Sequence, residues 1–84
     1  MEEKLNLDDE EHLESFLKRF QGSHFEDIMF EADVSLTDAI ALKSYAREKK
    51  AAIKFRKNGE IHLALLCEQE CEILYGCLSN EAKW

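Results

Sequence analysis

The chain has 84 residues, 45% of them hydrophobic, and a formal net charge of −7. This length allows one domain with a small core, and the composition is typical of a globular protein. No apolar run approaches the roughly 20 residues of a membrane helix, and the acidic N-terminus lacks the basic start of a secretory signal. We therefore expect a cytoplasmic protein with no membrane association, whose acidity disfavours broad affinity for nucleic acid.

Charge is unevenly distributed along the chain. Residues 1–33 carry eleven acidic and three basic residues, residues 34–66 carry three acidic and seven basic residues, and residues 67–84 carry four acidic residues and one basic residue. The acidic first third fits docking onto a basic partner, although an ordinary solvated helix face explains it too. The basic centre leaves a local site for an anion open.

Residues 1–7 are predicted to be a flexible acidic lead-in, and residues 8–84 a single domain, because there is no proline, linker or repeat. Residues 8–21 are predicted to be a helix, whose acidic start and basic end complement the helix dipole. Gly22 supplies its stop. Four apolar residues of this helix fall at i, i+3, i+4 and i+7 and form one stripe: Leu13, Phe16, Leu17 and Phe20.

Residues 25–32 are predicted to be a strand. Its alternate apolar residues share one face: Ile28, Phe30 and Ala32. Ser35 and Asp38 then form a capping box, which opens a helix that reaches about Lys49.

Residues 51–67 are predicted to be a β-hairpin around Asn58-Gly59. A loop of three residues, 57–59, pairs Phe55 with Ile61 and gathers the apolar side chains on one face. The last helix covers about residues 68–80, and Gly76 marks a position at which a shorter helix would end.

The predicted fold class is therefore α+β, a two-layer sandwich with the order α-β-α-β-β-α. It has a three-stranded mixed sheet with helices mainly on one face. Three strands make a layer about 14 Å wide, which accommodates two helices. The first helix is left short of sheet for its apolar stripe, so it either packs across an end of the other helices or covers a partner. We therefore predict that this stripe binds another protein, or a second copy of the chain in a homodimer, through Leu13, Phe16, Leu17 and Phe20.

The basic centre provides an alternative from another class, a nucleic-acid contact. Phosphates would lie along the end of the second helix and the exposed strand. The residues concerned are Arg47, Lys50, Lys54 and Arg56. No aromatic side chain is expected on the open face of that strand, and pairing of Lys54 and Arg56 with nearby acids explains their charge as well.

Catalytic, metal and cofactor sites are not predicted. The three cysteines coincide with the core stripe of the last helix and lack the second ligand pair of a zinc site: Cys67, Cys71 and Cys77. The three histidines lie on separate elements: His12, His24 and His62. The sequence therefore predicts a non-enzymatic protein-interaction module, acting as an adaptor, an inhibitor or a self-associating regulator. Nucleic-acid binding and a thiol-dependent enzyme remain as alternatives.

Overall fold

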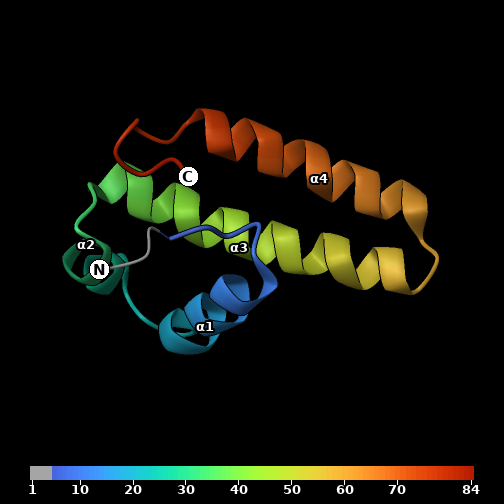
Figure 1. Cartoon of the computed structure of the whole chain (residues 1–84), viewed down its shortest axis with the longest axis horizontal. Helices are drawn as coiled ribbons and strands as arrows, with labels where there is room; N and C mark the ends of the chain where they lie inside the picture. Colours follow the sequence, from blue (N-terminus) through green and yellow to red (C-terminus); the bar gives the residue numbers. More distant parts are fainter. Residues whose placement is uncertain (1–4) are drawn as a thin grey trace.

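The computed structural model describes residues 5–84, and this part of the chain forms helices and connecting loops without a strand. The described residues contain four α-helices: α1 (Glu10–Phe20), α2 (Phe25–Ala32), α3 (Leu36–Lys57) and α4 (Ile61–Gly76). α3 and α4 run side by side as an antiparallel hairpin, while α1 and α2 pack against α3 (Figure 1). The predicted α+β sandwich with its three-stranded sheet is therefore wrong, and the fold is all-α.

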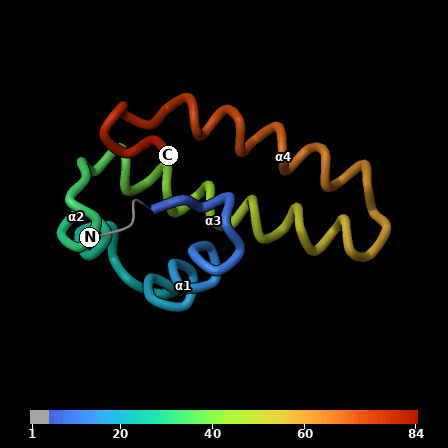
Figure 2. Tube along the Cα trace, in the orientation of Figure 1, coloured from blue at the N-terminus to red at the C-terminus, as the bar shows by residue number. Residues whose placement is uncertain are grey.

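The Cα trace shows α3 between its neighbours, with α1 on one side of it and α4 on the other (Figure 2). The predicted first helix is present as α1. The Asp9 carboxylate caps it by accepting hydrogen bonds from the backbone N–H groups of Glu11 and His12. Beyond Phe20 the chain turns at Gly22, whose φ of 82° costs glycine little.

The segment predicted as a strand, residues 25–32, is the helix α2. At its start the backbone N–H of His24 donates to the Asp27 carboxylate over 3.2 Å, which is one half of a capping box. At its end Asp33 takes the left-handed conformation, with a φ of 54°, and its N–H donates to the carbonyl of Met29. Both ends of this segment therefore carry the caps of a helix.

Burial within α2 follows the helical period rather than the alternation of a strand. Ile28 is fully buried, Met29 and Ala32 are partly buried, and Phe30 is 88% exposed. A strand would have placed Ile28, Phe30 and Ala32 on the same face. Eight residues with apolar side chains at both spacings satisfy either period, so the caps decide in favour of the helix.

The predicted β-hairpin is also wrong, because the helix that begins at Leu36 continues past Lys49 to Lys57. Its start is as predicted: the Ser35 hydroxyl accepts a hydrogen bond of 3.2 Å from the backbone N–H of Asp38. Residues 46–57 contain neither glycine nor proline and consist mainly of alanine, lysine and arginine, which are strong helix formers. The helix therefore propagates through the residues predicted as the first strand of the hairpin.

Asn58-Gly59 ends α3 instead of turning a hairpin. The N–H of Glu60 donates to the carbonyl of Phe55 over 2.8 Å, and the N–H of Gly59 donates to the carbonyl of Arg56 over 3.2 Å. With Gly59 at a φ of 80°, this is a Schellman motif, in which glycine takes the left-handed position after a helix. The dipeptide thus joins two helices.

α4 begins at Ile61 rather than near residue 68, so the residues predicted as the second strand are its first two turns. It ends at Gly76, where the sequence allowed a shorter helix to stop. The following segment returns to the core, where Leu78 and Ala82 are buried. The Trp84 ring packs edge-on against Tyr45, with the ring centres 4.9 Å apart.

The apolar stripe of α1 is enclosed within the chain. Leu13, Phe16 and Phe20 are 1%, 4% and 7% exposed, and Leu17 is partly buried against the same core. The core also draws side chains from the other helices and from both ends of the described chain: Leu7, Ile28, Ala39, Ala41, Leu42, Tyr45, Ala46, Cys71, Leu78 and Ala82. Because the chain forms no sheet of limited width over residues 5–84, the spatial reason for an uncovered first helix disappears.

Polar contacts fix both ends of the described chain onto α3. Asp38, 4% exposed, accepts hydrogen bonds from the backbone N–H and the hydroxyl of Ser79. Asp8 accepts hydrogen bonds from the Tyr45 hydroxyl and the Trp84 indole N–H. Of the predicted lead-in, residues 1–4 lie outside the described part, and Leu7 is fully buried.

We expect Asp38→Asn to lower the free energy of unfolding at neutral pH by about 1–3 kcal/mol, because a buried carboxylate with two donors is replaced by a poorer acceptor. Bonds from the hydroxyl and then the backbone of Ser79 hold the pKa of Asp38 below its ordinary value of 3.8. The stabilisation is therefore complete above that ordinary value and is lost as pH falls through the folded-state pKa.

Urea unfolding at neutral pH and at about pH 2.5 measures this effect, with Glu26→Gln as a control for loss of an exposed carboxylate. A deficit for Asp38→Asn of the same size at both pH values would contradict the assignment.

Candidate functional site

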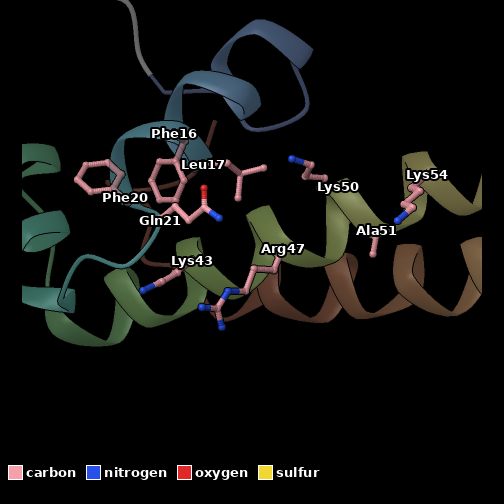
Figure 3. Close-up of a pocket in the computed structure, with 9 residues that line it drawn as sticks. All are labelled: Phe16, Leu17, Phe20, Gln21, Lys43, Arg47, Lys50, Ala51 and Lys54. Carbon is pink, nitrogen blue, oxygen red and sulfur yellow. The ribbon is translucent and has the colours of Figure 1, made fainter.

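A pocket of about 390 Å³ opens between α1 and α3. Its apolar lining comes mainly from α1, through Phe16, Leu17 and Phe20, and Ala51 of α3 adds to it. Gln21, just after α1, contributes an amide group. In Figure 3 the aromatic and leucine side chains come from α1 and the basic side chains come from α3. The pocket therefore has one apolar wall and one cationic wall.

The cationic wall is a single stripe of α3. Its members are spaced by four, three and four residues, which keeps them on one side of a helix: Lys43, Arg47, Lys50 and Lys54. All except Lys43 are exposed. A stripe of this length requires an unbroken helix, so it exists only because α3 continues past Lys49. We call these four residues the basic stripe.

Few contacts within the chain neutralise the positive charge of the basic stripe. Lys43 donates to the backbone carbonyl of Ser23 over 2.9 Å and lies 5.2 Å from the centre of the Phe25 ring. Within the described residues, the other three members of the stripe form no ion pair. Glu10 and Glu14 line a neighbouring hollow that also includes members of the stripe, yet no ion pair forms there. A patch of positive potential therefore faces the pocket in a chain of net charge −7.

The structure brings together most of the residues predicted for two separate sites. Phe16, Leu17 and Phe20 from the predicted partner-binding stripe line the same pocket as Arg47, Lys50 and Lys54 from the predicted nucleic-acid contact. Leu13, the remaining residue of the first set, lies in the core and does not line this pocket.

Arg56 is the member of the predicted basic contact that the structure separates from the others. Its guanidinium binds the Glu68 carboxylate of α4 through contacts of 2.7 to 3.0 Å, on the side of α3 that faces α4. The positive charge of Arg56 is thus neutralised by Glu68, an acid on α4. Glu31, one of the two acids (with Asp27) that the predicted sheet would have placed near Lys54 and Arg56, binds Arg19 instead, and that contact lowers the pKa of Glu31.

A second feature is the open side of α4. Ala64 and Cys71 are its buried residues, and they face α3. Five large apolar side chains on this helix are between 42% and 61% exposed: Ile61, Leu63, Leu65, Leu66 and Ile73. Among the described helices, α3 alone packs closely against α4, so much of the circumference of α4 has no neighbouring helix. The helix therefore leaves several large apolar side chains uncovered.

Part of this surface is continuous with α3. The Cys67 thiol of α4 lies near the Glu48 carboxylate of α3, which marks the edge where the two helices meet. Leu63, Leu66 and Ile73 lie on α4 beyond that edge, and Phe55 and Ile40 lie on α3 on its other side, as helical spacing requires. We call this surface the hairpin face. It was missed at the sequence level because residues 61–65 were assigned to a strand whose apolar side chains point inward.

The cysteines are free thiols with different surroundings. Cys71 is buried, Cys67 is partly buried and Cys77 is exposed. All three cysteines were predicted to lie in the core, and of the three only Cys71 is fully buried there. Burial raises the pKa of Cys71 to about 11. Burial, followed by the nearby Glu48 carboxylate, also raises the pKa of Cys67. Both effects oppose formation of the reactive thiolate.

The histidines do not converge. His12 accepts a hydrogen bond from the backbone N–H of Asn6, His24 caps α2, and His62 is exposed on α4. Among residues 5–84, no group of three or more histidine, cysteine, aspartate or glutamate side chains is arranged to hold a metal ion. Within the same range, no helix combines the length and the apolar character needed to cross a membrane.

Comparison of the chain with protein-family models, with curated proteins and with solved structures found no match.

The thiols are expected to react in the order of their exposure. In folded protein at about pH 8, a thiol reagent should modify Cys77 rapidly and Cys71 slowly, because a pKa of about 11 leaves roughly a thousandth of a buried thiol ionised. Spectroscopic titration measures the phases, and Cys77→Ser should remove the fast one. Rapid modification of Cys71 in the folded state would point to a thiol function.

Proposed function

We propose that this protein is a non-enzymatic interaction module that holds an amphipathic helix of another protein against the hairpin face. The observation that carries the proposal is the set of large apolar side chains on α4 that α3 leaves exposed. Large contiguous apolar surfaces on soluble proteins are typical of sites for partners. A cytoplasmic location accompanies the proposal, since three free thiols are characteristic of a reducing compartment.

A helix is the occupant that best fits this surface. Leu63, Leu66, Glu70 and Ile73 follow spacings of three, four and three residues, which is the seam of a coiled coil. Residues at this spacing form a straight ridge beside the groove between two antiparallel helices. A third helix that lies along the ridge would complete a small bundle and remove the apolar seam from water.

Charge favours a different protein over a second copy of this chain. Glu48 lies at the edge of the hairpin face and Glu70 lies within the seam, so the centre of the surface is acidic. A second copy would bring the same carboxylates into the contact, and each chain carries a net charge of −7. A partner helix with lysine or arginine near Glu70 pairs with this charge instead.

The predicted stripe on α1 contributes to this function indirectly. Leu13, Phe16 and Phe20 anchor α1 to α3 from the opposite side and so hold α3 in place. Truncating them would disturb binding through the fold rather than through a contact. The proposal therefore rests on α4, with α1 as support.

Leu66→Asp combined with Ile73→Asp is expected to abolish capture of the partner from a lysate of the native host. Both side chains are more than half exposed. The free energy of unfolding should therefore change little, by about 0.5 kcal/mol per substitution. Leu65→Asp is the matched control, because this residue is 47% exposed but lies on another side of α4. Quantitative affinity capture with the three proteins measures the difference.

Two outcomes would count against the proposal. The same proteins could be captured by wild type, by the double variant and by the control, which would leave the hairpin face without a role. Alternatively, sedimentation could find a dimer of the wild type that Leu66→Asp dissociates, which would assign the face to a second copy.

A further inference from the structure

We propose that the pocket between α1 and α3 binds a small amphiphilic anion, a single carboxylate or phosphate group attached to an apolar chain. This inference goes beyond the interaction module, because the pocket lies on the opposite side of α3 from α4 and uses different residues. It rests on the shape of the pocket and on the two kinds of side chain that line it.

The apolar wall provides the seat for the chain of the ligand. Leu17 is partly buried, and its side chain lies beside Phe16, while Ala51 lines the pocket from α3 (Figure 3). A volume of about 390 Å³ falls in the range of ligand pockets in proteins. Gln21 is the only uncharged polar side chain in the lining. A ligand rich in hydroxyl or amide groups would therefore find few partners.

The basic stripe provides the seat for the headgroup. From Lys43 to Lys54 it extends over eleven residues of α3, about 16 Å along the helix axis. Lys43 is engaged with Ser23 and Phe25 at one end. The headgroup is therefore placed among Arg47, Lys50 and Lys54, whose charges form no ion pair within residues 5–84.

Macromolecular anions fit this pocket less well. A peptide bound in extended form needs free backbone groups, and those of α1 and α3 are used within the helices. Nucleic-acid bases need exposed aromatic faces for stacking. Phe16 and Phe20 are 4% and 7% exposed and pack against each other, with ring centres 4.8 Å apart. The lining of the pocket therefore fits a small ligand with one negative charge and one apolar chain.

Calorimetric titration of the full chain with dodecanoate and with decanoate tests the proposal, below the concentrations at which these ligands self-associate. Both should bind, and each added CH₂ should tighten binding about two- to fourfold, because the half-open pocket buries part of each group. Decyltrimethylammonium, with the opposite charge, should not bind. Inorganic phosphate, with no chain, should bind at least tenfold more weakly than decanoate.

Substitutions connect binding to the two walls. Arg47→Gln together with Lys50→Gln should weaken binding of dodecanoate about five- to twentyfold, since each exposed charge contact contributes a few-fold. Ala51→Phe should weaken binding by filling the pocket. Lys57→Gln removes one positive charge from the same helix outside the pocket and should leave affinity unchanged. Circular dichroism checks that all variants remain helical.

Vesicles with and without phosphatidylglycerol distinguish a membrane lipid from a free anion as the source of this chemistry. Vesicle binding that is lost in the Arg47→Gln, Lys50→Gln variant assigns the headgroup to a lipid, and its absence assigns the pocket to a free ligand. The proposal is overturned if dodecanoate does not bind at millimolar concentration. It is equally overturned if phosphate or a single-stranded oligonucleotide binds as tightly as dodecanoate and Ala51→Phe has no effect.

Discussion

The structure depends on the continuity of α3, which runs unbroken from Leu36 to Lys57. A helix of 22 residues is about 33 Å long, close to the 37 Å of the longest dimension of the molecule over residues 5–84. α1, α2 and α4 each pack against it. The last residues of the chain also return to it, because Asp38 binds Ser79. Because α3 is the common neighbour, the faces it presents decide which surfaces the molecule exposes.

The two candidate surfaces follow from which sides of α3 the other helices cover. α1 covers one side with apolar residues and leaves the basic stripe at the rim of a pocket. α4 covers another side with small and moderate residues, such as Ala64 and Cys71, and leaves five of its larger apolar side chains exposed. This division of residues brings the two helices of the hairpin close together. The same division leaves Leu66 and Ile73 more than half exposed, which distinguishes α4 from an ordinary surface helix.

Local signals in the sequence predicted the parts of the fold that caps and periodicity determine. The stripe of α1 and the Ser35 cap are in this class, and both are confirmed. The errors occurred where a pattern has two physical solutions. Asn58-Gly59 fits a hairpin turn and a helix end equally well, and only the Schellman hydrogen bonds decide between them. Placing residues 51–57 in a strand also divided the basic stripe between two elements. The pocket could therefore not be assembled from sequence, although spacings of four, three and four from Lys43 were present.

The opposite signs of charge on the two surfaces have a structural origin. α1 turns its apolar stripe toward α3, and its acidic residues form no ion pair with the basic stripe, although Glu10 and Glu14 line the hollow beside it. Arg56, by contrast, faces α4 and is neutralised by Glu68. Arg47, Lys50 and Lys54 therefore remain without an ion pair among the described residues, while acidic residues such as Glu70 remain on the outer side of α4. An acidic chain thus carries a local cationic pocket because the helices pack through apolar faces, and overall net charge does not predict which ligands each surface can bind.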